Sequence, residues 1–206
     1  MYPEGKSGQW NSFEANAVAS LVFLMYERLG NKLQNELYKG KIKPCGSTPY
    51  NAQDFWKYGI RIVTPHRAQQ VLIISRLQKI FSSKDIPPSF IRDAVDTVER
   101  FQGQERDVII ASYALGDQDA INDEDEFLMS LNRFNVMSSR ARAKLIVFVS
   151  QEVVNHLSGD IDILRESRLL KVFAESYCNN SRIMNLGYLD SNGSPIKVEG
   201  IFKYRE

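Results

Sequence analysis

The order of apolar and polar residues predicts a helix near the start of the chain. A polar leader is followed by Asn11 and Glu14, whose spacing is typical of a helix N-terminal capping pair. Apolar side chains then recur every three or four residues, at Val18, Leu21, Val22, Met25 and Leu29. Gly30 follows, and glycine commonly ends a helix. We therefore predict one amphipathic helix over residues 11–29.

Short apolar runs alternate with helical patterns through most of the remaining chain. The runs indicate strands at residues 59–65, 94–98, 107–115 and 144–150, and 3.6-residue spacing indicates helices at 68–80, 131–141 and 161–177. Strands that are apolar on both faces, with helices between them, are typical of a parallel sheet covered on both sides. The sequence therefore predicts an α/β fold.

The segments between these elements are polar or irregular. Residues 31–58 lack a clear period and are interpreted as an irregular connection, and the acidic stretch 117–126 as a solvated loop. Near the end, the sequence DSNGSP separates two apolar runs, which indicates a β-hairpin. We expect one α/β domain over residues 1–178 and a hairpin appendage over 179–206.

Composition restricts the kinds of partner. Lys plus Arg number 26 and Asp plus Glu 25, so no overall positive field attracts nucleic acid or an acidic membrane, and such contacts must be local. Cys45 and Cys178 are far apart and lack a CxxC or histidine-rich neighbour, so we expect no disulfide framework and no metal site. Neither a membrane span nor a signal peptide is evident, and we predict a cytoplasmic protein without membrane contact.

The first segment whose residues are suited to ligand binding is 62–69, IVTPHRAQ. It places Thr64, Pro65 and Arg67 where a strand ends and a helix begins. In open α/β sheets, ligands usually bind at this carboxyl edge, where backbone N–H groups of the helix are available. The alternative is purely structural: Thr64 and Gln69 cap the helix, and Arg67 is a surface charge.

A second segment, residues 97–110 (TVERFQGQERDVII), crowds polar side chains around Gly103 between two apolar strands. A glycine at such a point allows the backbone to approach a ligand closely. Glu105 can accept a hydrogen bond from a ribose hydroxyl, and Gln102 or Thr97 can reach a phosphate. Alternatively, the charged residues only form surface ion pairs, which contribute little stability.

The third segment, residues 132–148 (NRFNVMSSRARAKLIVF), places Arg133, Arg140 and Arg142 around the end of a helix that leads into a strand. A guanidinium group forms paired, charge-assisted hydrogen bonds with phosphoryl oxygens and stays protonated. This chemistry favours an arginine finger, which stabilises charge on a transferred phosphoryl group. The structural alternative is a basic helix that faces solvent or the acidic stretch 117–126.

Taken in order, the three segments resemble motifs IV, V and VI of superfamily 1 helicases. The similarity is greatest to the up-frameshift and DNA-replication helicase group, whose second RecA-like motor domain typically reads TPYRAQ, VDxFQGxExDxII and RxNVAxTRAR. The likeness covers about residues 11–150, with His66 in place of the usual aromatic residue and Met137 in place of a small one. It implies a RecA-like parallel sheet with helices on both faces, a P-loop NTPase-type fold that lacks the P-loop itself.

The resemblance also implies roles for individual residues. Arg140 corresponds to the arginine finger that reaches the γ-phosphate of ATP held by the other motor domain. The implied ATP contacts are Gln102, Gly103, Glu105 and Arg142. The implied nucleic-acid contacts are Thr64, Pro65, Arg67 and Thr97.

The sequence contains no GxxxxGK[ST] loop and no DExx pair after a strand, which hold phosphate and magnesium in such motors. We therefore expect ATP and Mg²⁺ to be held mainly by a separate N-terminal RecA-like domain of the same helicase. This chain alone is expected to bind neither and to be inactive. Its expected partners are that first domain and single-stranded nucleic acid, DNA or RNA.

Two other interpretations have distinct signatures. A free-standing nucleic-acid-binding or regulatory module derived from a helicase would bind single strands without ATP. A Rossmann-type nucleotide enzyme would need a GxGxxG turn after a strand, and the sequence has none.

Overall fold

A four-stranded parallel sheet organises the chain in the computed structural model, which describes residues 9–28, 35–38, 41–44, 52–100, 105–189 and 194–205. The strand order is β4-β3-β5-β6. The strands are β3 (Ile60–Thr64), β4 (Val95–Thr97), β5 (Arg106–Ser112) and β6 (Ala141–Phe148). All neighbouring pairs run parallel, as the apolar runs predict.

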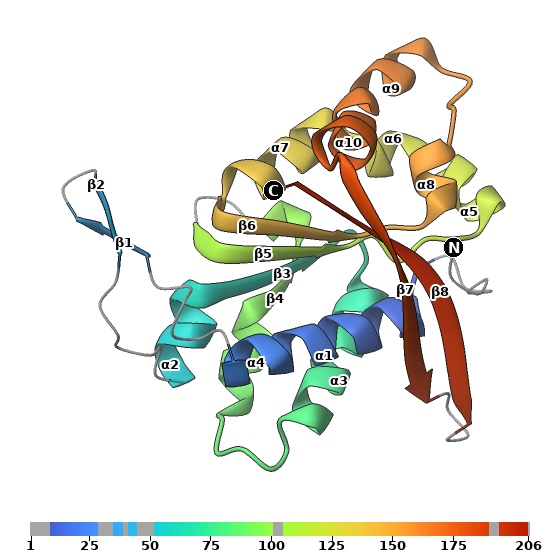
Figure 1. The fold of residues 1–206 in the computed structure, drawn as a ribbon. Coiled ribbons are helices and arrows are strands. Elements are labelled where there is room, and N and C mark those ends of the chain that lie inside the picture. Colours follow the sequence, from blue (N-terminus) through green and yellow to red (C-terminus); the bar gives the residue numbers. More distant parts are fainter. Residues whose placement is uncertain are drawn as a thin grey trace.

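Helices cover both faces of this sheet (Figure 1). One layer contains α1 (Ser12–Arg28), α3 (Arg67–Ile80) and α4 (Pro88–Ala94). The other contains α5 (Gln118–Asp123), α6 (Asp125–Leu128), α7 (Leu131–Ser139), α8 (Gln151–Asn155), α9 (Ile161–Glu166) and α10 (Arg168–Val172). Along β5, Val108 and Ile110 face the first layer, and Ile109 faces the second. The predicted RecA-like α/β class is confirmed.

The acidic stretch 117–126 is not a loop, so that prediction is wrong. It forms α5 and the start of α6, because the Asp117 side chain caps α5 by accepting a hydrogen bond from Ala120 N at 3.0 Å. Ile121 and Leu128 are buried against the sheet and hold the two short helices in place. The acidic residues of this stretch predict a solvated loop, because two apolar residues are too few to give a visible helical period.

Three other element predictions need correction. Within 31–58 the structure has an antiparallel pair, β1 (Asn35–Tyr38) with β2 (Lys41–Pro44), then α2 (Ala52–Asp54) and the π-helical turn η2 (Phe55–Gly59). The helix predicted over 161–177 is divided into α9, α10 and the π-helical turn η4 (Phe173–Tyr177). The strand predicted over 107–115 ends at Ser112, since Ala114 has a φ of 66° and turns the chain away.

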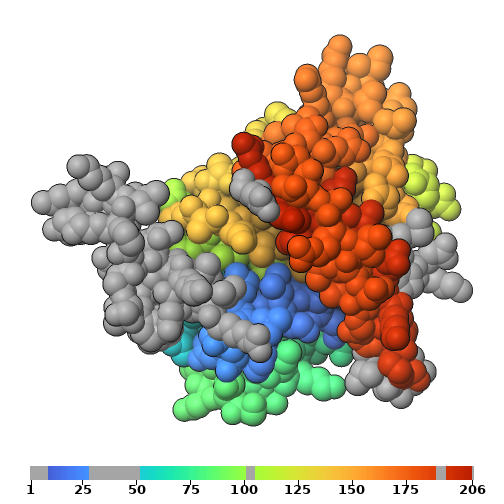
Figure 2. All heavy atoms as spheres, in the orientation of Figure 1, coloured from blue at the N-terminus to red at the C-terminus, as the bar shows by residue number. Residues whose placement is uncertain are grey.

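The predicted hairpin is present as β7 (Asn180–Leu189) and β8 (Pro195–Tyr204), paired from Asn180↔Tyr204 to Leu189↔Pro195. It runs across the molecule from the α10 side to the α1 side, and it lies on the surface beside α1 in Figure 2. The rings of Phe13 and Tyr188 are 5.9 Å apart, so the hairpin packs on the start of α1. No helix within the described residues is long and apolar enough to span a membrane.

Candidate functional site

The carboxyl edge of the sheet brings together the first group of predicted residues. Thr64 and Thr97 are register partners at the ends of β3 and β4. Both are buried, and Thr64 Oγ1 accepts a hydrogen bond from His66 N at 3.5 Å. Pro65 is half-buried, and Arg67 is exposed at the start of α3. The exposed part of this group is therefore the turn after β3 with the Arg67 guanidinium.

The second group lies at the opposite, amino edge of the sheet. Glu105 is exposed directly before β5, and Arg140 follows α7 directly before β6. A hydrogen bond of 3.0 Å from Arg106 N to Arg140 O joins the two segments. Gln102 and Gly103 lie outside the described residues. The predicted residues thus form two groups at opposite edges, and Glu105 and Arg140 belong to the same one.

The arginines around α7 differ sharply in their partners. Arg133 Nε is 3.2 Å from Glu99 Oε1, and its guanidinium stacks 3.8 Å above the Phe127 ring. Arg142 Nη2 is 2.7 Å from Oδ1 of Asp107, which is fully buried. Arg140 has no acidic partner among the residues that the structure describes, and its Nε is buried without a hydrogen-bond acceptor there. Of these three arginines, Arg140 is therefore the one without a carboxylate partner among the described residues.

Two further arginines, which the sequence analysis did not select, increase the positive charge at the amino edge. Burial, followed by repulsion from Arg61 and Arg142, lowers the pKa of Arg106. Burial also lowers the pKa of Arg61, although its Nη2 is 3.0 Å from Asp96 Oδ2. Each arginine stands near the start of a strand, in GIRIV and ERDV, which is the sequence signal that identifies them. Mutual repulsion among these cations would be relieved by a bound anion.

Asp107 gives this edge a measurable pH dependence. Burial raises its pKa to about 6, against the opposing attraction of Arg142. Between pH 4 and 6 the folded state therefore holds more protons than the unfolded state, and stability falls as the pH rises. Relative to Asp107→Asn, we expect the free energy of unfolding of the wild type to fall by up to about 3 kcal/mol across this window. Urea titrations of both proteins at a series of pH values measure this fall. Free energies of unfolding that change with pH in the same way in both proteins would contradict the prediction.

A buried polar network connects α1 to the carboxyl edge. The sequence did not predict this network. Asn11 Oδ1 accepts from Glu14 N at 3.0 Å, as the capping prediction requires, but the Glu14 carboxylate points elsewhere. It accepts hydrogen bonds from Ser112 Oγ and, at 2.9 Å, from Ala114 N. Gln69 accepts from Asn11 N at 2.8 Å and donates to Ser112 Oγ at 2.9 Å. Gln69 therefore bridges three elements and does not cap α3.

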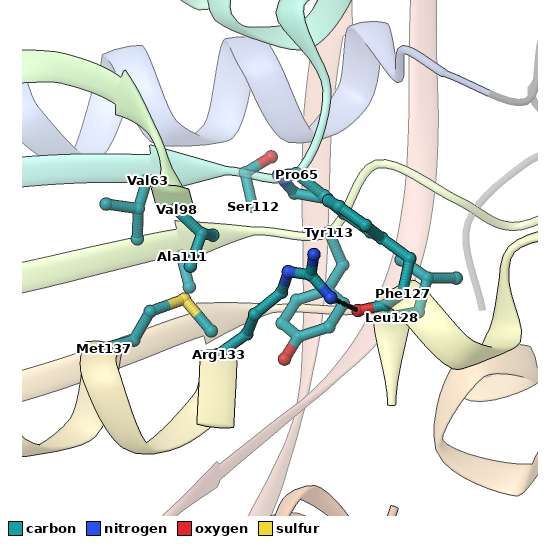
Figure 3. Close-up of a pocket in the computed structure, with 10 residues that line it drawn as sticks. All are labelled: Val63, Pro65, Val98, Ala111, Ser112, Tyr113, Phe127, Leu128, Arg133 and Met137. Carbon is teal, nitrogen blue, oxygen red and sulfur yellow. Dashed lines mark hydrogen bonds between the residues drawn. The ribbon is translucent and has the colours of Figure 1, made fainter. Parts of the chain in front are cut away.

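An aromatic stack borders the turn after β3. His66 is buried and stacks on Phe127 at 6.1 Å, so it occupies the position of the usual aromatic residue with a ring of its own. Burial lowers the His66 pKa, although Glu124, 3.4 Å from its Nε2, acts in the opposite direction. Arg133 also lies over the Phe127 ring and donates to Phe127 O at 3.3 Å (Figure 3).

A small pocket lies beside Phe127 and Arg133 (Figure 3). Pro65, Phe127, Arg133 and Met137 are among its lining residues, and its volume is ≈ 10 Å³. That is about the space of one water molecule, so a nucleotide does not fit in it. Within the described residues, no group of three or more His, Cys, Asp or Glu side chains is arranged to hold a metal ion. This pocket therefore does not serve as a nucleotide site, and the exposed arginines lie outside it at the two edges of the sheet.

Comparison with known proteins gives a consistent result. A family model described as "AAA domain" matches residues 3–152. The chain is 32% identical over 93 residues to "Probable RNA helicase armi" of Drosophila melanogaster and 36% identical over 88 residues to "Probable helicase senataxin" of Mus musculus, each match covering 43% of the chain. It is 29% identical over 133 residues, 62% of the chain, to "DNA replication ATP-dependent helicase/nuclease dna2" of Schizosaccharomyces pombe. These matches span 7%, 3% and 9% of the respective relatives.

Proposed function

The chain belongs to the AAA domain family and is a superfamily 1 helicase domain of the up-frameshift-like group, and we propose that it is the second motor domain of an ATP-dependent helicase. In this proposal residues 1–178 form the RecA-like motor domain and 179–206 an appended hairpin. The partner is a first motor domain that supplies the phosphate-binding loop and the magnesium ligands.

The availability of Arg140 is the observation that carries this proposal. Arg133 and Arg142 are each engaged by a carboxylate, whereas Arg140 has none among the described residues. It also lies at the amino edge with Glu105, Arg61 and Arg106, where burial and the repulsion of Arg61 and Arg142 lower the pKa of Arg106. A triphosphate presented to this edge by another domain would meet the Arg140 guanidinium group, to which no described carboxylate is paired.

The residues of this chain would act on ATP by binding and positioning. Arg140 would donate charge-assisted hydrogen bonds to the γ-phosphate and stabilise the charge that develops during transfer. Glu105 would accept from a ribose hydroxyl, while Gln102, Gly103 and Arg142 complete the contact region. The hydrogen bond between Arg106 N and Arg140 O would hold the two segments in a fixed relation as the cleft closes.

The carboxyl edge would contact single-stranded nucleic acid through its sugar-phosphate backbone. Arg67 supplies the exposed charge, and Thr64, Pro65 and Thr97 shape the turn that presents it. Contacts of this kind tolerate any base sequence and weaken as salt rises, because counterions are released on binding. The affinity of this edge for the single strand would then change with the nucleotide state at the opposite edge.

Arg67→Ala is expected to weaken binding of the isolated chain to single strands of any sequence. Removing one phosphate contact lowers the slope of log affinity against log salt by about 0.7. Fluorescence anisotropy between about 50 mM and about 200 mM salt measures both quantities. Arg182→Ala, an exposed arginine on β7, is the matched control and should leave the slope unchanged. Equal slopes for wild type and Arg67→Ala would remove Arg67 from the strand-binding surface.

A further inference from the structure

The segment that follows β6 exposes aliphatic side chains on its outer side. Leu157 is 73% exposed and Ile161 66%, and Leu164 and Val172 are also exposed. The inner side of the same segment is anchored, because Leu170 is buried in the core and Lys171 Nζ donates to His156 O. The helix α9 lies at the outer end of its layer, and α10 lies beneath it at the level of α6 and α7 (Figure 1). The fold therefore holds this apolar surface in place, and no element among the described residues packs over it.

These side chains border an open groove of ≈ 370 Å³. Its apolar lining includes Leu157, Leu164 and Val172, and its basic lining Arg165, Arg168 and Lys171. From residue 164 to 172 the lining positions recur every three or four residues, so they form one continuous face along α9 and α10. A face of this shape fits the side chains of a second helix, which pack between its ridges.

The charges around the groove are unbalanced. Arg165 pairs with Asp162 at 3.1 Å, but both side chains are highly exposed, and such pairs contribute little. Arg168 has no acidic partner within the part of the chain that the structure describes. Glu175 is an acidic lining residue, beyond Val172 in the chain. The surface thus combines exposed aliphatic groups with an excess of positive charge.

We propose that this groove binds an acidic amphipathic helix of a partner protein. Leucine-like side chains at positions i, i+4 and i+7 of the partner would rest on Leu157, Leu164 and Val172. Carboxylates on the flanks would pair with Arg165 and Arg168, and a basic residue would face Glu175. Single-stranded nucleic acid fits less well, because its bases stack on aromatic rings and this lining is aliphatic. None of these residues takes part in the proposed contacts with ATP or with the strand.

The test is binding of the full chain to a labelled helical peptide with leucines on one face and glutamates on both flanks. We expect saturable binding, with affinity reduced at least about tenfold by Leu164→Asp and by Arg168→Glu, the loss expected when a well-packed anchor is removed. A peptide with lysines in place of the glutamates should bind wild type weakly and Arg168→Glu more tightly. That reversal cannot arise from misfolding. Val71→Asp and Lys197→Glu, exposed positions outside the groove, should bind the glutamate peptide like wild type.

Several results would overturn the proposal. One is the absence of saturable binding to the glutamate peptide, and another is equal binding of the glutamate and lysine peptides. Self-association of the chain that Leu164→Asp abolishes would assign the groove to a second copy. A single-stranded oligonucleotide that displaces the peptide, and whose own affinity falls with Arg168→Glu, would assign it to nucleic acid.

Discussion

Replacing Arg140 with alanine in a polypeptide that contains both motor domains is expected to lower the nucleic-acid-stimulated kcat for ATP hydrolysis by about 10³-fold or more. The physical reason is that the guanidinium group would act on charge that develops only in the transition state. The KM for ATP should change much less, because most of the nucleotide would be held by the first domain. Steady-state phosphate release at saturating nucleic acid gives both constants.

Two further variants separate a direct role of Arg140 from a general loss of structure. Arg140→Lys keeps the charge and loses the planar fork, so it should recover only a small part of the rate. Arg182→Ala removes an exposed arginine on the hairpin and should retain full activity. A loss of less than about tenfold for Arg140→Ala, far below the arginine-finger range, would show that this residue is not the finger.

Replacing Glu14 with alanine is expected to lower the free energy of unfolding by about 3–5 kcal/mol. Its carboxylate is fully buried and accepts from Ser112 Oγ and Ala114 N, so truncation leaves two buried donors without their acceptor and creates a cavity. Since Ala114 has a positive φ, the turn that its N–H anchors is also strained. For a domain of this size, the melting temperature should fall by about 6–20 °C.

Glu27→Ala provides a control on the same helix. Glu27 forms an exposed ion pair with Lys84 at 2.7 Å, and pairs of this kind contribute less than about 1 kcal/mol. Thermal unfolding of the two variants, followed by circular dichroism, should therefore differ clearly. Similar melting temperatures for Glu14→Ala and Glu27→Ala would mean that the buried network contributes no more than a surface pair.

Much of the fold follows from local patterns in the sequence. The strands β3, β4 and β6 and the helices α1, α3 and α7 lie where apolar periodicity predicts them. Periodicity succeeds here because each element buries one face or both faces against the same core. It fails at residues 117–126, where Ile121 is the one fully buried apolar residue and acidic side chains dominate the composition.

For the candidate site, the sequence predicts the positions of the residues in the fold but not their partners. The sequence places Arg140, Glu105 and Arg67 at the ends of elements, and they lie there in the structure. It cannot tell which arginines are already occupied, because Glu99 is 34 residues from Arg133 in the chain and Asp107 is far from Arg142. It also misses Arg61 and Arg106, whose proximity follows from the parallel pairing of β3 with β5.

The sequence by itself determined the alternation of strand and helix, the parallel sheet and the three motifs, since each depends on neighbouring residues and on the period of burial. Only the tertiary structure decided which polar side chains are engaged and which are available. The Glu14 carboxylate reaches Ser112 across 98 positions of the chain, and Asn11 meets Gln69 across 58. Contacts at such separations depend on strand order and helix packing, which arise from the whole core and leave no local pattern in the sequence.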